Sequence, residues 1–150
     1  METMTTVRQI LRKKGDQVWW VDPDATVYSV LELMAEQNIG AVLVMREGRL
    51  LGILSERDYA RKVILLGRAS ATTLVRDIMS ANVVCVRPDQ TVAECMALMT
   101  VRRFRHLPVL EHGRIVGVIS IGDVVKEVIS EQQFIIEQLE NYIIGGSVPT

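Results

Sequence analysis

The residues best suited to chemistry in this 150-residue chain are a serine and an aspartate three positions apart, and this pair occurs twice. We call Gly52-Ile-Leu-Ser55-Glu-Arg-Asp58 the first motif and Gly117-Val-Ile-Ser120-Ile-Gly-Asp123 the second motif. A helix that begins at the serine turns its unpaired N–H groups and its positive dipole end toward an anion such as a phosphate. A carboxylate in the first turn can accept hydrogen bonds from two neighbouring hydroxyls, as on a sugar.

The same spacing also has a purely structural interpretation. Ser-x-x-Asp is an acidic form of the capping box, which any helix can use to satisfy its own N–H groups. The two roles can coexist in one motif. In the binding interpretation, the glycine lets a flat group approach the strand, and the apolar residues Ile53 and Val118 face that group.

A search for internal repeats explains why the motif occurs twice. Shifting the sequence by 65 positions aligns 21–61 with 86–126, and 13 of the 41 aligned pairs are identical. Chance would give about two or three, so the chain holds two copies of one unit.

Each copy predicts the element order β-α-β-β-α. The short β-rich runs are Val18–Val21 and Val83–Val86, and a helix start at Thr26 or Thr91 follows each. Hairpins are expected around Glu47-Gly48 and His112-Gly113, and the last helix of each copy is expected to begin at its motif serine. Because about 45 residues cannot cover both faces of a sheet, the copies are predicted to pack on each other.

Three segments lie outside the repeats. The spacing predicts an N-terminal helix over Val7–Lys14 and a C-terminal helix with a long apolar stripe, and residues 67–80 link the copies. The stripe could pack on the chain's own core, but a subunit interface is slightly favoured. Its apolar residues are Phe134, Ile135, Ile136, Leu139, Tyr142, Ile143 and Ile144.

The doubled unit with its two motifs, together with Arg105-His106-Leu107-Pro108-Val109, resembles the CBS domain, the module named for cystathionine β-synthase. The resemblance implies an α/β (α+β) fold, in which two tandem β-α-β-β-α units pack sheet to sheet as a pseudo-two-fold pair with flanking terminal helices. The implied boundaries are 15–66 and 80–128 for the two domains, with 1–14 and 129–150 as the flanking helices.

The resemblance further implies a regulatory module without chemistry or a catalytic cofactor of its own. Such modules bind AMP, ADP, ATP, NAD(H) or S-adenosylmethionine in two clefts between the paired domains. A homodimer and a regulated partner protein are expected with it. Two alternatives stay open: an interaction or scaffolding protein whose motifs only cap helices, and, far less favoured, an enzyme using Asp58 and Asp123.

The two clefts are expected to differ, because the copies differ in and beside the motifs. The first cleft is predicted to use Val18, Ile39, Ala41, Ile53, Ser55, Arg57 and Asp58. The second is predicted to use Val83, Arg105, His106, Pro108, Val118, Ser120, Gly122 and Asp123, with Arg102 and Arg103 as further phosphate partners.

Composition excludes several other classes of protein. A net charge of −1 argues against general nucleic-acid binding, and no apolar run is long enough to span a bilayer. Without a secretory signal, a cytoplasmic location is expected. Two cysteines and two histidines offer no metal site, and both cysteines are predicted to be buried and inert. Of Trp19 and Trp20, at most one can face a given cleft, and core packing is favoured for the inward one.

Overall fold

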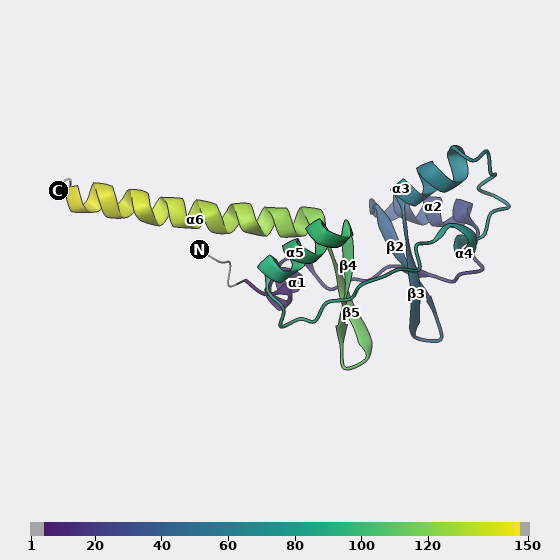
Figure 1. Ribbon diagram of the computed structural model, residues 1–150, viewed down its shortest axis with the longest axis horizontal. Helices are drawn as coiled ribbons and strands as arrows, with labels where there is room; N and C mark the ends of the chain where they lie inside the picture. The colour runs from purple at the N-terminus through teal and green to yellow at the C-terminus, as the bar shows by residue number, and fades with distance from the viewer. Residues whose placement is uncertain (1–4, 148–150) are drawn as a thin grey trace. The chain divides into compact units, whose positions relative to one another are not determined.

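The structure of the chain is a computed structural model that describes residues 5–147, with side chains described up to Ile143 (Figure 1). Contacts divide it into two compact units. One contains residues 17–85 and 112–116, and the other contains the residues up to Asp16, 86–111 and those from Gly117 on. Each unit holds one copy of the repeat, except that residues 112–116 of the second copy are grouped with the unit of the first. The bounds of the two predicted domains and of the two flanking helices stay predictions. The predicted terminal segments at 1–4 and 148–150, and the Ile144 side chain, lie outside the described residues.

The unit with the first copy is built on a three-stranded sheet in the order β1-β2-β3. Its elements are β1 (Trp20–Val21), α2 (Val27–Gln37), β2 (Ala41–Arg46), β3 (Arg49–Ser55), α3 (Glu56–Tyr59) with the wider π turn η1 (Ala60–Ile64), and α4 (Val75–Ile78). Strand β1 runs parallel to β2, and β2 runs antiparallel to β3. The buried core residues come from α2, β2, β3, η1 and α4: Val27, Val30, Met34, Val42, Val44, Leu54, Val63, Val75 and Ile78.

The unit with the second copy is built on the two-stranded sheet β4-β5. Its elements are α1 (Val7–Lys14), α5 (Val92–Arg102), β4 (His106–Glu111), β5 (Arg114–Ser120) and the 27-residue helix α6 (Ile121–Ser147). Buried residues from all five elements and from Val86 form its core: Val7, Ile10, Leu11, Val86, Val92, Cys95, Met99, Leu107, Val109, Ile119 and Val124. The mixed α/β class is therefore confirmed, with six α-helices and two small sheets in the described residues.

Local sequence signals predicted the helix starts and hairpins correctly. The hydroxyls of Thr26 and Thr91 cap α2 and α5, and Ser55 caps α3. In the hairpin turns, Glu47 and His112 have φ values of 52° and 51°. Each is followed by a glycine at positive φ, which is the two-residue turn that suits a twisted hairpin.

The first strand of each copy was predicted too long. Regular pairing covers only Trp20–Val21 in the first copy, and a single parallel bridge joins Val86 to Val109 in the second. The β-rich composition of Val18–Val21 and Val83–Val86 favours an extended backbone, but strand structure also needs a neighbouring strand with which to form hydrogen bonds.

Each copy is completed by the segment that precedes the other copy. Helix α1 belongs to the unit of the second copy, where the Val7 and Arg8 amides donate to the Gln90 and Pro88 carbonyls at 2.9 Å each. In the first copy, the linker plays this part, because the Val27 amide donates to the Thr73 carbonyl and the Val75 amide donates to the Ala25 carbonyl, at 2.9 Å each. The sequence predicted α1 only as a segment that flanks the pair and assigned it to neither copy.

One further feature concerns membranes. Within the described residues, no helix combines the length and the apolar character that crossing a bilayer requires.

Candidate functional site

The first motif lies where three segments of its unit meet. Ala41 pairs with Ser55 in the β2–β3 register, and the Glu56 amide donates to the Gly40 carbonyl at 3.0 Å. On the other side of β2, the Leu43 amide donates to the Trp19 carbonyl at 3.0 Å, and Val18 precedes Trp19 directly. The fold therefore brings the predicted residues Ala41 and Ser55 together and places Val18 on the neighbouring segment.

Asp58 takes part in a complete capping box. Its Oδ2 atom accepts hydrogen bonds from the Ser55 amide and hydroxyl, both at 3.0 Å, and its own amide donates to Ser55 Oγ at 3.2 Å. Its other oxygen, Oδ1, lies 3.4 Å from Lys62 Nζ, one turn further along the helix. The structural interpretation of the motif is thus confirmed, and it uses one carboxylate oxygen.

The second motif repeats this geometry with one addition. The Ile121 amide donates to the Arg105 carbonyl at 2.8 Å, as the Glu56 amide does to Gly40. Asp123 Oδ2 accepts from the Ser120 amide at 2.8 Å and also from Lys14 Nζ at 2.6 Å. Both of these hydrogen bonds reach Oδ2, and neither of them uses Oδ1.

The charge of Asp123 is stabilised by this arrangement. Burial by itself would raise the pKa of the carboxyl group, but the hydrogen bond from Lys14 and those from Ser120 outweigh it and hold the pKa below its usual value. Asp123 is therefore an anion at neutral pH. Neither Lys14 nor Lys62 was among the predicted site residues. Lys62 could have been found by its i+4 spacing from Asp58, whereas Lys14 precedes Asp123 by 109 residues and no local pattern points to it.

The role predicted for the two glycines was wrong. A Cβ atom on Gly52 would lie 2.6 Å from the Ser80 carbonyl oxygen, and one on Gly117 would lie 2.6 Å from Leu11 Cδ2. The side of the strand that each glycine leaves open is occupied by its own unit. Packing within the unit, and not the approach of a ligand, therefore accounts for both glycines.

The remaining predicted residues differ in exposure. Arg57, Arg102, Arg103, Arg105 and Gly122 are exposed, while Ile39, Ile53, Val118, His106 and Val83 are half-buried. Pro108 is buried, and its carbonyl accepts a hydrogen bond from the Val86 amide at 2.9 Å. Val83 belongs to the unit of the first copy, whereas Ser120 and Asp123 belong to the other unit.

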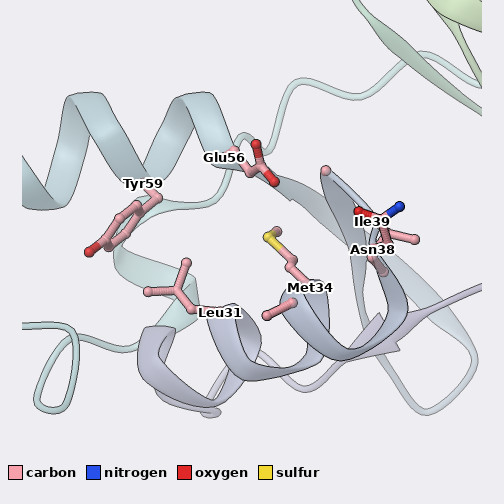
Figure 2. A pocket seen from close by; sticks show the side chains of 8 residues that line it. Leu31, Met34, Asn38, Ile39, Glu56 and Tyr59 are labelled. Carbon is pink, nitrogen blue, oxygen red and sulfur yellow. The ribbon is translucent and has the colours of Figure 1, made fainter.

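A cavity of about 460 Å³ opens beside the first motif, between α2 and the start of α3. Figure 2 shows the Leu31 and Met34 side chains reaching from α2 toward Glu56 and Tyr59 on α3. The cavity is lined by Leu31, Met34, Ala35, Asn38, Ile39, Gly40, Glu56 and Tyr59. It shares only Ile39 with the predicted first cleft, and neither Ser55 nor Asp58 lines it.

The cysteines and tryptophans differ in burial. Cys95 is buried, and desolvation, with a smaller contribution from Glu94, raises its pKa to about 11. Cys85 is only half-buried, although desolvation raises its pKa as well. Trp19 packs against the core of its unit, whereas Trp20 is 58% exposed. The described residues contain no group of three or more His, Cys, Asp and Glu side chains that could hold a metal ion.

Comparison with known proteins agrees with this geometry. The family model of the CBS domain matches residues 5–64 and 75–130. An Arabidopsis thaliana protein, "CBS domain-containing protein CBSX3, mitochondrial", is 40% identical over 151 residues, which span 95% of this chain and 73% of the relative.

Two solved structures extend the comparison. A candidate signal-transduction protein with CBS domains from Burkholderia ambifaria MC40-6 is 52% identical, with a TM-score of 0.82, over 85% of this chain and 96% of that one. The CBS domain pair of MJ0100, solved in complex with 5′-methylthioadenosine and S-adenosyl-L-methionine, shares the fold at 21% identity and a TM-score of 0.76. That match covers 86% of this chain and 99% of that one.

Proposed function

The chain belongs to the CBS domain family, and on that premise we propose that it is a non-catalytic regulatory protein that binds adenosine-containing ligands and signals to a partner protein. The candidate ligands are AMP, ADP, ATP, NAD(H) and S-adenosylmethionine. The sites are the two motifs with the residues predicted around them, and their position in clefts between the two copies stays a prediction.

The observation that carries this proposal is the repeated geometry of the motif. In both units, a strand ends in a half-buried serine at the N-terminus of a helix, and the aspartate three residues later caps that helix through Oδ2. Because capping uses only this oxygen, the carboxylate keeps acceptor capacity for the two hydroxyls of a ribose. The helix N-terminus beside it favours a phosphate.

The solved relative supports the class of ligand. The MJ0100 pair was solved with two compounds that contain adenosine, and neither of them carries a phosphate. At 21% identity, that likeness establishes the fold alone, so the choice among adenosine compounds belongs to experiment.

Thermal shift measurements on ligand-free protein with AMP, ADP, ATP, NAD, NADH and S-adenosylmethionine test the proposal. A ligand at a hundred times its dissociation constant adds about 2.7 kcal/mol of stability. For a chain of this size, that raises the melting temperature by roughly 5–10 °C. An interaction protein whose motifs are only caps would show no shift with any of them. Product analysis after incubation with ATP or NAD would expose the enzymatic alternative.

We also propose that the chain forms a homodimer through α6. This 27-residue helix lies along α5 and then extends past the rest of its unit (Figure 1). One face of α6 has the alternating four- and three-residue spacing of a coiled-coil seam. The seam positions are Val125, Ile129, Gln132, Ile136 and Leu139, and Tyr142 lies beside the seam. These apolar side chains are 45% to 80% exposed.

The area of this seam is large enough for a dimer. Burying a large apolar side chain removes on the order of 100 Å² from water, so five in each of two copies give about 1,000 Å². That is about the smallest area expected of a specific interface. Most of the predicted apolar stripe is exposed, which favours a second copy of the chain as the partner of this face. Ile135 is half-buried in its own unit, whereas the exposed members are Phe134, Ile136, Leu139, Tyr142 and Ile143.

The combined substitution Ile136→Glu and Leu139→Glu is expected to weaken dimerisation at least a hundredfold, because it places four carboxylates in the apolar seam. Analytical ultracentrifugation measures the change. Asn141→Glu adds a charge on the outer face of the same helix and should leave the dimer intact. A monomeric unsubstituted chain, or a doubly substituted chain that still dimerises, would contradict the proposal.

A cytoplasmic location remains part of the proposal. The Arabidopsis relative is described as mitochondrial, so cell fractionation decides between the two compartments.

A further inference from the structure

The two motifs differ in a cation that comes from a distant part of the chain. Lys14, the last residue of α1, places Nζ 2.6 Å from Asp123 Oδ2 and 2.8 Å from the Val118 carbonyl oxygen. The ion pair is partly screened from water, since the side chains of Lys14 and Asp123 are 36% and 22% exposed. One ammonium group thus engages both a carboxylate and a strand carbonyl of the second motif.

The corresponding position beside the first motif carries no charge. Thr6 bridges Thr91 as Leu74 bridges Thr26, and Leu11 contacts Gly117 as Met79 contacts Gly52. Both correspondences have an offset of 68 residues, which aligns Lys14 with Asn82. The cation near Asp58 is Lys62 of its own helix, at the longer distance of 3.4 Å, and it also donates to the Ile78 carbonyl at 3.0 Å.

The position of Lys14 has a consequence for ligands. Its ammonium occupies the Val118 carbonyl oxygen, an acceptor that a base would use, and lies beside the carboxylate that would hold the ribose. A neutral nucleoside must therefore displace a positive charge without supplying a new anion for it. Leaving a charged group without its partner costs more than the loss of an ordinary hydrogen bond. A phosphate on the ligand supplies a new anionic partner for the ammonium, and the flexible four-carbon stem of lysine allows Nζ to turn toward it.

We propose that Lys14 makes the second motif selective for phosphorylated adenosine compounds over neutral or cationic ones. The first motif, with Asn82 in the corresponding place, lacks this selection. The inference rests on the proposed function, because it assumes that the second motif binds an adenosine compound. It specifies which member of that class the site takes.

Calorimetric titration with AMP and with adenosine tests the inference on the full chain carrying Asp58→Ala, which weakens binding at the first motif so that the second motif dominates the titration. AMP is expected to bind at least tenfold more tightly than adenosine. Lys14→Met, which keeps the apolar stem, should weaken AMP binding about tenfold or more while adenosine binds as well as before or better. The ratio of the two affinities within one variant is insensitive to a general loss of stability.

Lys13→Met is the matched control. Lys13 is on the same helix, carries the same charge and pairs with Glu127 at 3.0 Å, so its loss should leave the AMP-to-adenosine ratio unchanged. A ratio that Lys14→Met does not alter, or that Lys13→Met alters equally, overturns the role of Lys14 and leaves the proposed function standing. If the unsubstituted chain binds none of the candidate adenosine compounds, S-adenosylmethionine included, the proposed function fails, and the inference fails with it.

Discussion

Gly52→Ala is expected to destabilise the protein by about 3 kcal/mol, whereas Gly117→Ala should cost about 1 kcal/mol. The new methyl group at position 52 would lie 2.6 Å from the Ser80 carbonyl oxygen. That carbonyl accepts from the Ile53 amide at 2.9 Å, and the Ser80 amide donates back to the Ile53 carbonyl at 2.8 Å, so the backbone can move only by breaking the bridge.

The same methyl group at position 117 would meet only the end of the Leu11 side chain, which can change its rotamer. Neither glycine has a positive φ, so backbone strain contributes to neither substitution. Replacing either glycine by alanine also reduces the conformational entropy of the unfolded chain. This small stabilisation is the same for both variants, so it does not affect the difference between their stabilities. Urea denaturation of the two variants without nucleotide measures the difference. Equal costs would show that the linker segment does not pack on Gly52 in solution.

Replacing Asp58 or Asp123 by alanine is expected to weaken nucleotide binding at the altered site by about 1.5–3 kcal/mol, or roughly ten- to a hundredfold. The carboxylate that would hold the ribose is then lost. The same substitution removes a capping partner and should lower stability by about 1 kcal/mol. Calorimetry with the ligand found by thermal shift, together with melting curves, measures the two effects separately.

Glu94→Ala is the control that separates capping from binding. Glu94 forms the capping box of α5 with Thr91, where its amide donates to Thr91 Oγ1 at 3.1 Å, but it belongs to neither motif. Its loss should lower the melting temperature while leaving the ligand affinity unchanged. If the Asp58 and Asp123 variants behave like Glu94→Ala, with lower stability and full affinity, the motifs are caps only, and the scaffolding interpretation is favoured.

Much of each unit could be predicted from the sequence because its determinants are local. The hydroxyl of Thr26 or Thr91 lies three residues from the amide that it caps, and Glu47-Gly48 and His112-Gly113 specify their turns by their own conformational preferences. Because the two copies align at an offset of 65 residues, the elements predicted for one copy could also be predicted for the other. The capping geometry of Ser55 and Asp58 was predictable for the same reason.

The environment of the motifs could not be predicted in this way. Which segment packs on Gly52 or Gly117, and which cation reaches Asp123, depends on residues 27 to 109 positions away. Neither helical nor strand periodicity carries information about such distant partners, and no local pattern assigned α1 to either copy.

The sequence alone therefore determined the doubled β-α-β-β-α unit, its helix caps and its hairpins, because each of these depends on interactions between residues a few positions apart. Only the tertiary structure decided that each copy is completed by the segment preceding the other. It also decided that Gly52 and Gly117 leave room for packing within their units, and that Lys14 forms an ion pair with Asp123. Those contacts form when apolar side chains such as Leu11 are buried against distant elements, and this burial depends on how the chain folds in space.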